Sequence, residues 1–224
     1  MNRGIIYYTS NRIDEKIMKM GQELILKAGL PIVSCSLRSI DFGKNIVLNL
    51  ERGVHTMYKQ ILTALEASES EYIFFCEHDV LYHPTHFDFK TTNNEIFYYN
   101  TNVWRWDWNS QKIITYDHLV SVSGLCVNRL KAIEHYRKRL ETIVKKGYDK
   151  LPSHNPAWAR AMGYEPGKKT GEQIEEWKSE YPNIDIRHSK TITPIKMTLD
   201  SFTHQPTGWK ESMIDTLWIK IFLQ

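Results

Sequence analysis

Residues 72–79, Tyr-Ile-Phe-Phe-Cys-Glu-His-Asp, decide the fold predicted for this chain. The run from residue 72 to residue 76 is apolar without interruption, which is typical of a strand buried on both faces of a parallel sheet. The polar residues Glu77, His78 and Asp79 follow it directly. Because ligands of open α/β sheets bind beyond the carboxyl ends of the strands, the sequence predicts a functional site at this point.

The segments before this stretch predict alternating strands and helices. Residues 5–8 form a β-prone run that ends in turn and cap residues, and residues 32–37 form a second apolar run. Apolar residues recur at helical spacing over residues 13–24 and, most regularly, over residues 54–65. Three strands separated by two helices indicate an α/β fold with a mostly parallel central sheet flanked by helices, of the nucleotide-binding type.

The pattern changes after Pro84. Residues 96–127 predict shorter strands that form a smaller, partly antiparallel portion, and a second long helical period begins at residue 130. Residues 149–169 are rich in Pro, Gly, Lys and His and predict a long loop or lid. A capping box formed by Thr170 and Gln173 predicts another helix, and residues 209–223 predict an amphipathic C-terminal helix.

Composition excludes several classes of protein. The chain has 224 residues, enough to bury a core without disulfides or a structural metal, and its composition is neither that of a disordered chain nor that of a coiled coil. The net charge of +3 is too small to predict a general polyanion-binding surface. The first residues lack a signal-peptide pattern, and no run approaches the ~20 apolar residues that span a bilayer.

Cysteine usage adds an expectation about the compartment. Cys35, Cys76 and Cys126 each lie within an apolar run and share no CxxC spacing. This pattern predicts buried free thiols in a reducing compartment, and hence a cytoplasmic protein.

The acidic pair after the central strand suggests metal chemistry. If strand geometry continues through residues 77–79, Glu77 and Asp79 lie on one side and His78 on the other. Two carboxylates at a strand end suit Mg²⁺ or Mn²⁺ that also holds a diphosphate, and the ion would neutralise the charge on a departing phosphate. His83 and His86 allow a second interpretation, a hydrolase metal cluster with the two carboxylates, although Pro84 interrupts any helix that would align them.

A dense aromatic stretch lies in the second half of the chain. Trp104, Trp106 and Trp108 alternate with Arg105 and Asp107, so the three indoles share one face of a strand. This face either packs against a helix or presents rings to sugars or bases, and Asp107 could hydrogen-bond hydroxyl groups or act as a base.

These features together resemble the nucleotide-sugar domain of GT-A-fold glycosyltransferases, similar to family 2. The resemblance covers roughly the first 90 residues and rests on the first strand ending in Thr-Ser-Asn-Arg, the Gly53-led helix, and Glu77-His78-Asp79 in place of an Asp-x-Asp motif. It implies one domain over residues 1–224, with a nucleotide-sugar half (1–90) and an acceptor half (91–224). The residues that it implies for the donor are Thr9, Asn11 and Arg12 near the nucleoside, Asp41 near the base or ribose, Lys59 near the diphosphate, and Glu77.

The resemblance also implies the remaining site residues. Asp79 is expected to bind the metal directly, with His188 as a further ligand because some of these enzymes supply a C-terminal His. Residues 170–177 are similar to the Gly-Glu-Asp helix start that carries the base of inverting members, but Gln173 replaces the Asp and cannot accept a proton. The expected base is therefore Glu172, and then Asp107.

The predicted function is metal-dependent transfer of a sugar from a nucleotide-diphosphate sugar to an acceptor hydroxyl. The acceptor stays open between a glycan, a lipid-linked sugar, a protein and a modified DNA base. The donor sugar, the stereochemical outcome and the oligomeric state stay open as well. The alternatives are a metal-dependent hydrolase and a non-catalytic module that binds a nucleotide or a carbohydrate.

Overall fold

Two β-sheets organise the chain in a computed structural model that describes residues 2–150, 163–191, 193 and 195–219. The larger sheet has the strand order β10-β6-β9-β4-β1-β2-β3. Neighbouring strands pair in parallel, except that β9 runs antiparallel to β4 and to β6. Its strands are β1 (Arg3–Thr9), β2 (Ile32–Ser36), β3 (Lys44–Val47), β4 (Tyr72–Glu77), β6 (Phe97–Asn100), β9 (Leu125–Asn128) and β10 (Ile174–Trp177).

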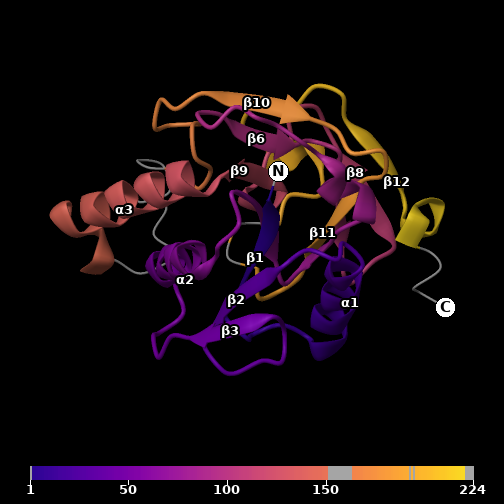
Figure 1. Cartoon of the computed structure of the whole chain (residues 1–224). Helices are drawn as coiled ribbons and strands as arrows, with labels where there is room; N and C mark the ends of the chain where they lie inside the picture. Colours follow the sequence, from indigo (N-terminus) through magenta and orange to yellow (C-terminus); the bar gives the residue numbers. More distant parts are fainter. Residues whose placement is uncertain (1, 151–162, 192, 194, 220–224) are drawn as a thin grey trace.

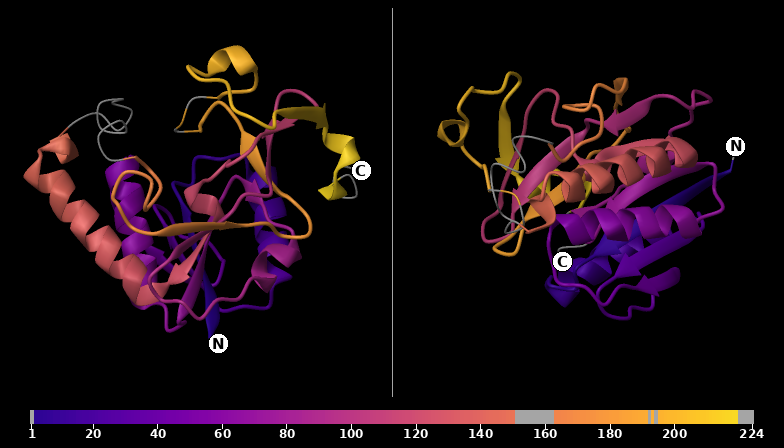
Figure 2. Two further views of the ribbon diagram at one scale, coloured as in Figure 1. Left: turned by 90° about the horizontal axis from the view of Figure 1, so that it is seen from above. Right: turned by 90° about the vertical axis from the view of Figure 1, so that its left-hand side faces the viewer.

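Helices cover both faces of the larger sheet (Figures 1 and 2). The helices α2 (Val54–Ala67) and α3 (Arg129–Lys145) pack on one face, against side chains that include Ile6 and Phe75. The opposite face presents Ile5 and Phe74 to a second apolar cluster. Successive residues of β1 and β4 thus point into two different cores, which is why each strand contains an uninterrupted apolar run, residues 5–8 and residues 72–76.

A smaller sheet lies beside the carboxyl end of β4 and has the order β12-β8-β7-β11-β5. Only the β7–β11 pair is parallel among its described pairs. The indole of Trp106 and the apolar residues of β11 pack against the helix α1 (Glu15–Leu26), together with Trp104 and Trp108. The aromatic stretch therefore forms core. The strands are β5 (Val80–Leu81), β7 (Val103–Asp107), β8 (Lys112–Thr115), β11 (Asn183–Arg187) and β12 (Lys210–Met213).

This architecture confirms the predicted fold class, an α/β fold with a mostly parallel central sheet and an antiparallel portion. The three cysteines are free and buried, as the sequence predicts. No helix among the described residues is long and apolar enough to cross a membrane.

The helix predicted to begin at Thr170 is wrong. Residues Ile174–Trp177 form the edge strand β10, whose backbone pairs with Phe97–Asn100 of β6. The Thr170 hydroxyl accepts a hydrogen bond from the amide of Gly167, and Gly171 has a φ of 81°, a left-handed conformation in which a helix cannot start. Local capping chemistry is thus overridden by pairing with a strand that is distant in sequence.

The predicted C-terminal helix is also wrong over its described part. Lys210–Met213 pairs antiparallel with Lys112–Thr115 as β12, and a short 3₁₀ helix follows at Ile214–Thr216. Of the loop predicted over residues 149–169, residues 151–162 lie outside the described residues. Residues 163–170 have no strand or helix and form turns, in keeping with the loop prediction.

Candidate active site

A cleft of about 340 Å³ opens at the carboxyl ends of β1 and β4. On one side it is lined by Tyr8 and Thr9 of β1 and by the first turn of α2. The other side is lined by residues of the smaller sheet, among them Asp185 and Arg187 of β11. Figure 2 shows the smaller sheet beside this end of the larger one, so the cleft lies where the two sheets meet.

Three potential metal ligands, His78, Asp79 and His188, lie close together; His78 and Asp79 line the cleft, and His188 lies outside its lining. One donor atom from each residue lies within 4.8 Å of the other two. His78 and Asp79 occupy the tight turn between β4 and β5, and His188 follows β11. The backbone amide of Ile186 donates to the carbonyl of Asp79 at 2.8 Å, and β5 pairs with β11, so the turn is fastened to the strand that delivers His188.

The three donors fit a divalent ion. His78 Nδ1 and His188 Nε2 are buried and have no hydrogen-bond partner among the described residues, although His188 Nε2 lies 3.4 Å from an Asp79 oxygen. Burial lowers the pKa of His78, which favours the neutral imidazole that binds metals. Burial raises the pKa of Asp79, but the histidines and Arg187 outweigh it and hold that pKa below its usual value. Two imidazoles with one carboxylate suit Mn²⁺ or a similar transition ion better than Mg²⁺.

Glu77 lies beside this cluster and not in it, contrary to the strand geometry predicted through residues 77–79. The strand ends at Glu77, and the following turn brings His78, instead of Glu77, next to Asp79. The Glu77 carboxylate accepts a hydrogen bond from the Tyr8 hydroxyl at 2.7 Å. Burial, and then the charge of Asp79, raises the pKa of Glu77 to about 8.

The residues predicted to contact the donor separate into two groups. Thr9 and Glu77 line the cleft, whereas Asn11, Arg12, Asp41 and Lys59 do not. Asn11 instead joins the ends of β1 and β2, because its Oδ1 accepts hydrogen bonds from the amides of residues 37 and 38.

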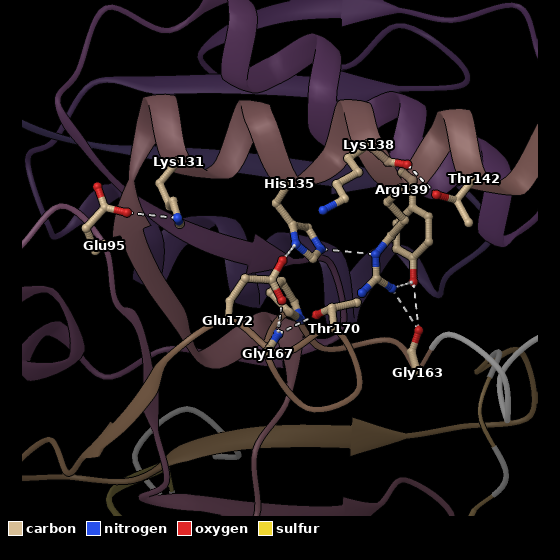
Figure 3. Close-up of polar contacts among 12 residues, drawn as sticks. Glu95, Lys131, His135, Lys138, Arg139, Thr142, Gly163, Gly167, Thr170 and Glu172 are labelled. Atoms are coloured by element: carbon tan, nitrogen blue, oxygen red, sulfur yellow. Dashed lines mark hydrogen bonds and ion pairs between the residues drawn. The ribbon is translucent and has the colours of Figure 1, made fainter.

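The two predicted bases also lie outside the cleft lining. Figure 3 shows Glu172 turned toward α3, where it accepts a hydrogen bond from His135 Nδ1 at 2.5 Å and another from the Gly167 amide. His135 Nε2 in turn accepts from Arg139, which also donates to the carbonyl of Gly163. Glu172 thus fastens the turn after residue 162 to α3.

Asp107 is placed at the end of β7. Its carboxylate accepts a hydrogen bond from the amide of Asn109 at 3.1 Å and so closes a local turn.

The histidines of the hydrolase interpretation do not join Asp79. His83 bonds to Thr85, and its ring packs against Tyr181 with 4.4 Å between the centroids. His86 is fully buried and meets the side-chain amides of two asparagines. Within the described residues, the group able to hold a metal is His78, Asp79 and His188.

The sequence reasoning missed several charged residues of the cleft. Asp185 is buried between Arg105, at 3.5 Å, and Arg187, at 3.3 Å. Glu165, from the turn after residue 162, also lines the cleft and forms no ion pair among the described residues. The one available signal was the alternation over residues 183–187, which places residues 185 and 187 on one face.

The N-terminus of α2 supplies a positive end to the cleft. Gly53 caps the helix without a side-chain hydrogen bond, and no acidic residue lies in the first turn. Gly53 and Thr56 line the cleft beside Arg52, whose guanidinium donates to the carbonyl of Lys190. Free amides at the start of a helix, with its dipole, favour an anion such as a phosphate.

No family model and no curated protein matches the chain. Among solved structures it is similar to a glycosyltransferase involved in the glycosylation of the major capsid of PBCV-1, at 11% identity and a TM-score of 0.47 over 80% of this chain and 82% of that one. It is similar to the inositol-1-phosphate CTP transferase from T. maritima at 12% identity and a TM-score of 0.47, over 86% of this chain and 94% of that one.

The apo-form glycosyltransferase GlyE of Streptococcus pneumoniae TIGR4 is similar at 10% identity and a TM-score of 0.46, over 79% of this chain. The chain covers 45% of GlyE, less than half of its length. At these values the likenesses describe the arrangement of strands and helices and assign no activity.

Proposed function

We propose that the protein is a glycosyltransferase that uses a divalent metal and a nucleotide-diphosphate sugar to glycosylate an acceptor hydroxyl. The observation that carries this proposal is the group His78, Asp79 and His188 at the carboxyl end of β4, of which His78 and Asp79 line the cleft. Ligands of parallel α/β sheets bind at this edge. A divalent ion held there would act as a Lewis acid toward the charge that develops on the leaving diphosphate.

The surroundings of the metal group suit the rest of such a donor. The uncapped start of α2 and the Arg52 guanidinium lie on the same cleft and offer hydrogen-bond donors to phosphate oxygens. Tyr8 and Thr9, at the end of β1, leave room beside them for the nucleoside. Groups able to bind an anion thus line the same cleft as two of the metal ligands.

Glu165 is the proposed proton acceptor of an inverting transfer. In this step the acceptor oxygen bonds to the anomeric carbon, the bond from that carbon to the diphosphate breaks, and the acceptor proton passes to a carboxylate. The other cleft carboxylates have partners: Asp79 faces two imidazoles, and Glu77 and Asp185 are held by hydrogen-bond or charged partners. The roles predicted for Glu172 and Asp107 stay predictions, and both side chains are engaged elsewhere.

A thermal-shift experiment on the full chain tests the proposal. UDP, GDP, CDP and TDP are added with and without Mn²⁺ to the wild type and to Asp79→Asn. A nucleotide present at about 100 times its Kd stabilises the native state by about 2.7 kcal/mol, which is easily measured. We expect one nucleotide to raise Tm only with Mn²⁺ and only when Asp79 is intact. His83→Gln is the matched control and should keep the shift, because His83 lies outside the metal group.

Other results would assign the cleft differently. Nucleotide binding without any turnover of the matching nucleotide-sugar would indicate the non-catalytic module. Release of pyrophosphate from a nucleoside triphosphate and a sugar phosphate would indicate nucleotidyl transfer. No shift with any nucleotide would overturn the proposal.

A further inference from the structure

One wall of the cleft is formed by residues of the smaller sheet and of the segments that follow it, and it contains both cationic and aromatic side chains. Arg105 of β7 donates to the Tyr116 hydroxyl at 3.0 Å, and its guanidinium carbon lies 5.5 Å from the centre of that ring. Lys196 Nζ lies 4.8 Å from the centre of the Phe202 ring. All four residues line the cleft. Each of the two rings in the cleft lining therefore has a cationic side chain close to it.

The aromatic part of this wall is assembled from separate segments. Phe202 meets Tyr116 edge to face, with 5.4 Å between the ring centroids. Trp209 stacks on Tyr116 at 6.1 Å with nearly parallel planes, and also contacts Phe202. Three mutually packed rings form a fixed surface, since each restricts the rotation of the others. Flat ring faces of this kind pack against the apolar C–H faces of sugars.

The wall carries more positive than negative charge. Asp185 lies 3.5 Å from Arg105 and 3.3 Å from Arg187, so its single negative charge neutralises one of the two positive charges. The charged residues of the smaller-sheet side that line the cleft are Arg105, Asp185, Arg187, Lys190 and Lys196. This surplus of cations on the smaller-sheet side favours an anionic group in a ligand that contacts the wall.

The wall lies beyond the space expected for the donor. Arg105 is on β7, one strand from the β11 strand that delivers His188, and Tyr116 follows β8, one strand further. With neighbouring strands about 4.8 Å apart, the backbone that carries Tyr116 lies about 10 Å across the sheet from β11, and Arg105 lies between Tyr116 and Asp185 of β11. The donor diphosphate is proposed to meet Arg52 and the free amides at the start of α2, which line another part of the same cleft.

We propose that Arg105, Tyr116, Lys196 and Phe202 form an acceptor subsite for a sugar that bears an anionic group. The ring of this sugar packs on the aromatic faces, and Arg105 and Lys196 pair with its carboxylate or phosphate. The inference rests on the proposed function only in assigning this sugar the role of acceptor.

Binding of simple sugars to the full chain tests the subsite. Titrations followed by ligand-observed NMR compare methyl glucuronide and glucose 6-phosphate with neutral methyl glucoside, first alone and then with Mn²⁺ and each nucleoside diphosphate. We expect both anionic sugars, or one of them, to bind at least about tenfold more tightly than the glucoside, as one charge-assisted hydrogen bond provides. The preferred anion then distinguishes a uronic acid from a phosphorylated sugar.

Variants locate the bound sugar. Lys196→Gln should weaken binding of the anionic sugar by about fivefold to tenfold and leave the nucleotide-dependent rise in Tm unchanged. Arg105→Lys, which keeps the charge beside buried Asp185 but loses the bond to Tyr116, should weaken sugar binding as well. Lys168→Gln, an exposed lysine outside the cleft lining, is the matched control.

Two results would overturn the subsite. Equal affinity for the neutral and the anionic sugars would remove the role of the cations. If Lys196→Gln lost the rise in Tm caused by the nucleotide while sugar binding was unchanged, the wall would be assigned to binding of the donor instead. Binding of anionic sugars in the absence of any nucleotide shift would instead overturn the proposed function and leave the sugar site in place, so the two failures are distinguishable.

Discussion

At the scale of single residues, Glu165 differs from the other acidic side chains of the cleft because no partner holds its carboxylate among the described residues. Its lone pairs therefore stay available to a substrate hydroxyl, and availability within hydrogen-bond reach is the first requirement for a general base. The neighbouring Glu172 supports this placement, since its bond to the Gly167 amide fixes the turn that carries Glu165.

Glu165→Gln tests the base at this scale. The amide keeps the size of the side chain but cannot take the proton, so we expect sugar transfer to fall by about 10² to 10⁴ fold. The rise in Tm with nucleotide and Mn²⁺ should be unchanged, because the metal ligands are intact. Transfer rates and thermal shifts are measured on the same preparations, with exposed Glu180→Gln as control. Wild-type transfer by Glu165→Gln would return the role to Glu172 or Asp107.

At the scale of elements, α3 and the turn after residue 162 are joined by a relay through one neutral histidine. Arg139 Nε donates to His135 Nε2, so Nδ1 carries the proton that binds Glu172. Burial, together with the charge of Arg139, lowers the pKa of His135 and outweighs the hydrogen bond to Glu172, which raises it. Burial raises the pKa of Glu172, but its hydrogen bonds from His135 and Thr170 bring that pKa down to about 2.

This relay predicts how stability depends on pH. The pKa of His135 is lower in the native protein than the value of about 6.5 in an unfolded chain, and the pKa of Glu172 is likewise lower than its unfolded value of about 4.5. The unfolded state then binds more protons, so the free energy of unfolding decreases as pH falls from about 6.5 toward about 2. Glu172→Gln should lose less stability than the wild type between about pH 5 and about pH 3.

Urea midpoints across this range measure the effect. Exposed Glu175→Gln, a carboxylate of the neighbouring strand β10, should keep the wild-type dependence on pH. A slope for Glu172→Gln equal to that of the wild type would mean that the relay does not couple to folding.

The elements that the sequence predicted correctly are those in which one physical signal dominates. The strand Tyr72–Glu77 is apolar on both faces, and α2 keeps a regular helical period, so neither depends on distant partners. The strands β10 and β12 were predicted as helices because their pairing partners, β6 and β8, lie far away in sequence. Local signals at Thr170 gave no indication of those partners.

The same limit applies to the candidate site. Asp79 and His188 were expected as metal ligands, and the structure brings them together, whereas His78 was assigned to the opposite side of an extended strand. The turn that follows Glu77 places His78, and not Glu77, next to Asp79. The sequence of the turn does not indicate this arrangement. The charged wall was missed because Arg105 and Asp185 become neighbours only through the pairing of β7 with β11.

At the scale of the whole molecule, the reactivity of the three cysteine thiols shows whether the larger sheet is folded. Cys35, Cys76 and Cys126 are buried in strands of the larger sheet, and burial raises the pKa of each thiol, to about 12 for Cys35. Because the thiolate is the reactive form, the native protein should not react with a disulfide reagent at about pH 8.

Thiol titration with and without denaturant checks this expectation. All three thiols should react once the chain is unfolded, and none on the timescale of mixing while it is native. Rapid reaction of a native thiol would show that a strand of the larger sheet opens readily.

The bond from the Ile186 amide to the Asp79 carbonyl, which fastens the turn after β4 to β11, has a consequence for biosynthesis. During translation His78 and Asp79 leave the ribosome early, while His188 and the strand that carries it are made much later. The growing chain can form most of the parallel strands without completing the metal group. If the proposed metal group binds Mn²⁺, a ribosome-bound chain that ends before residue 188 should therefore not retain the ion, because one of its three ligands has not been made.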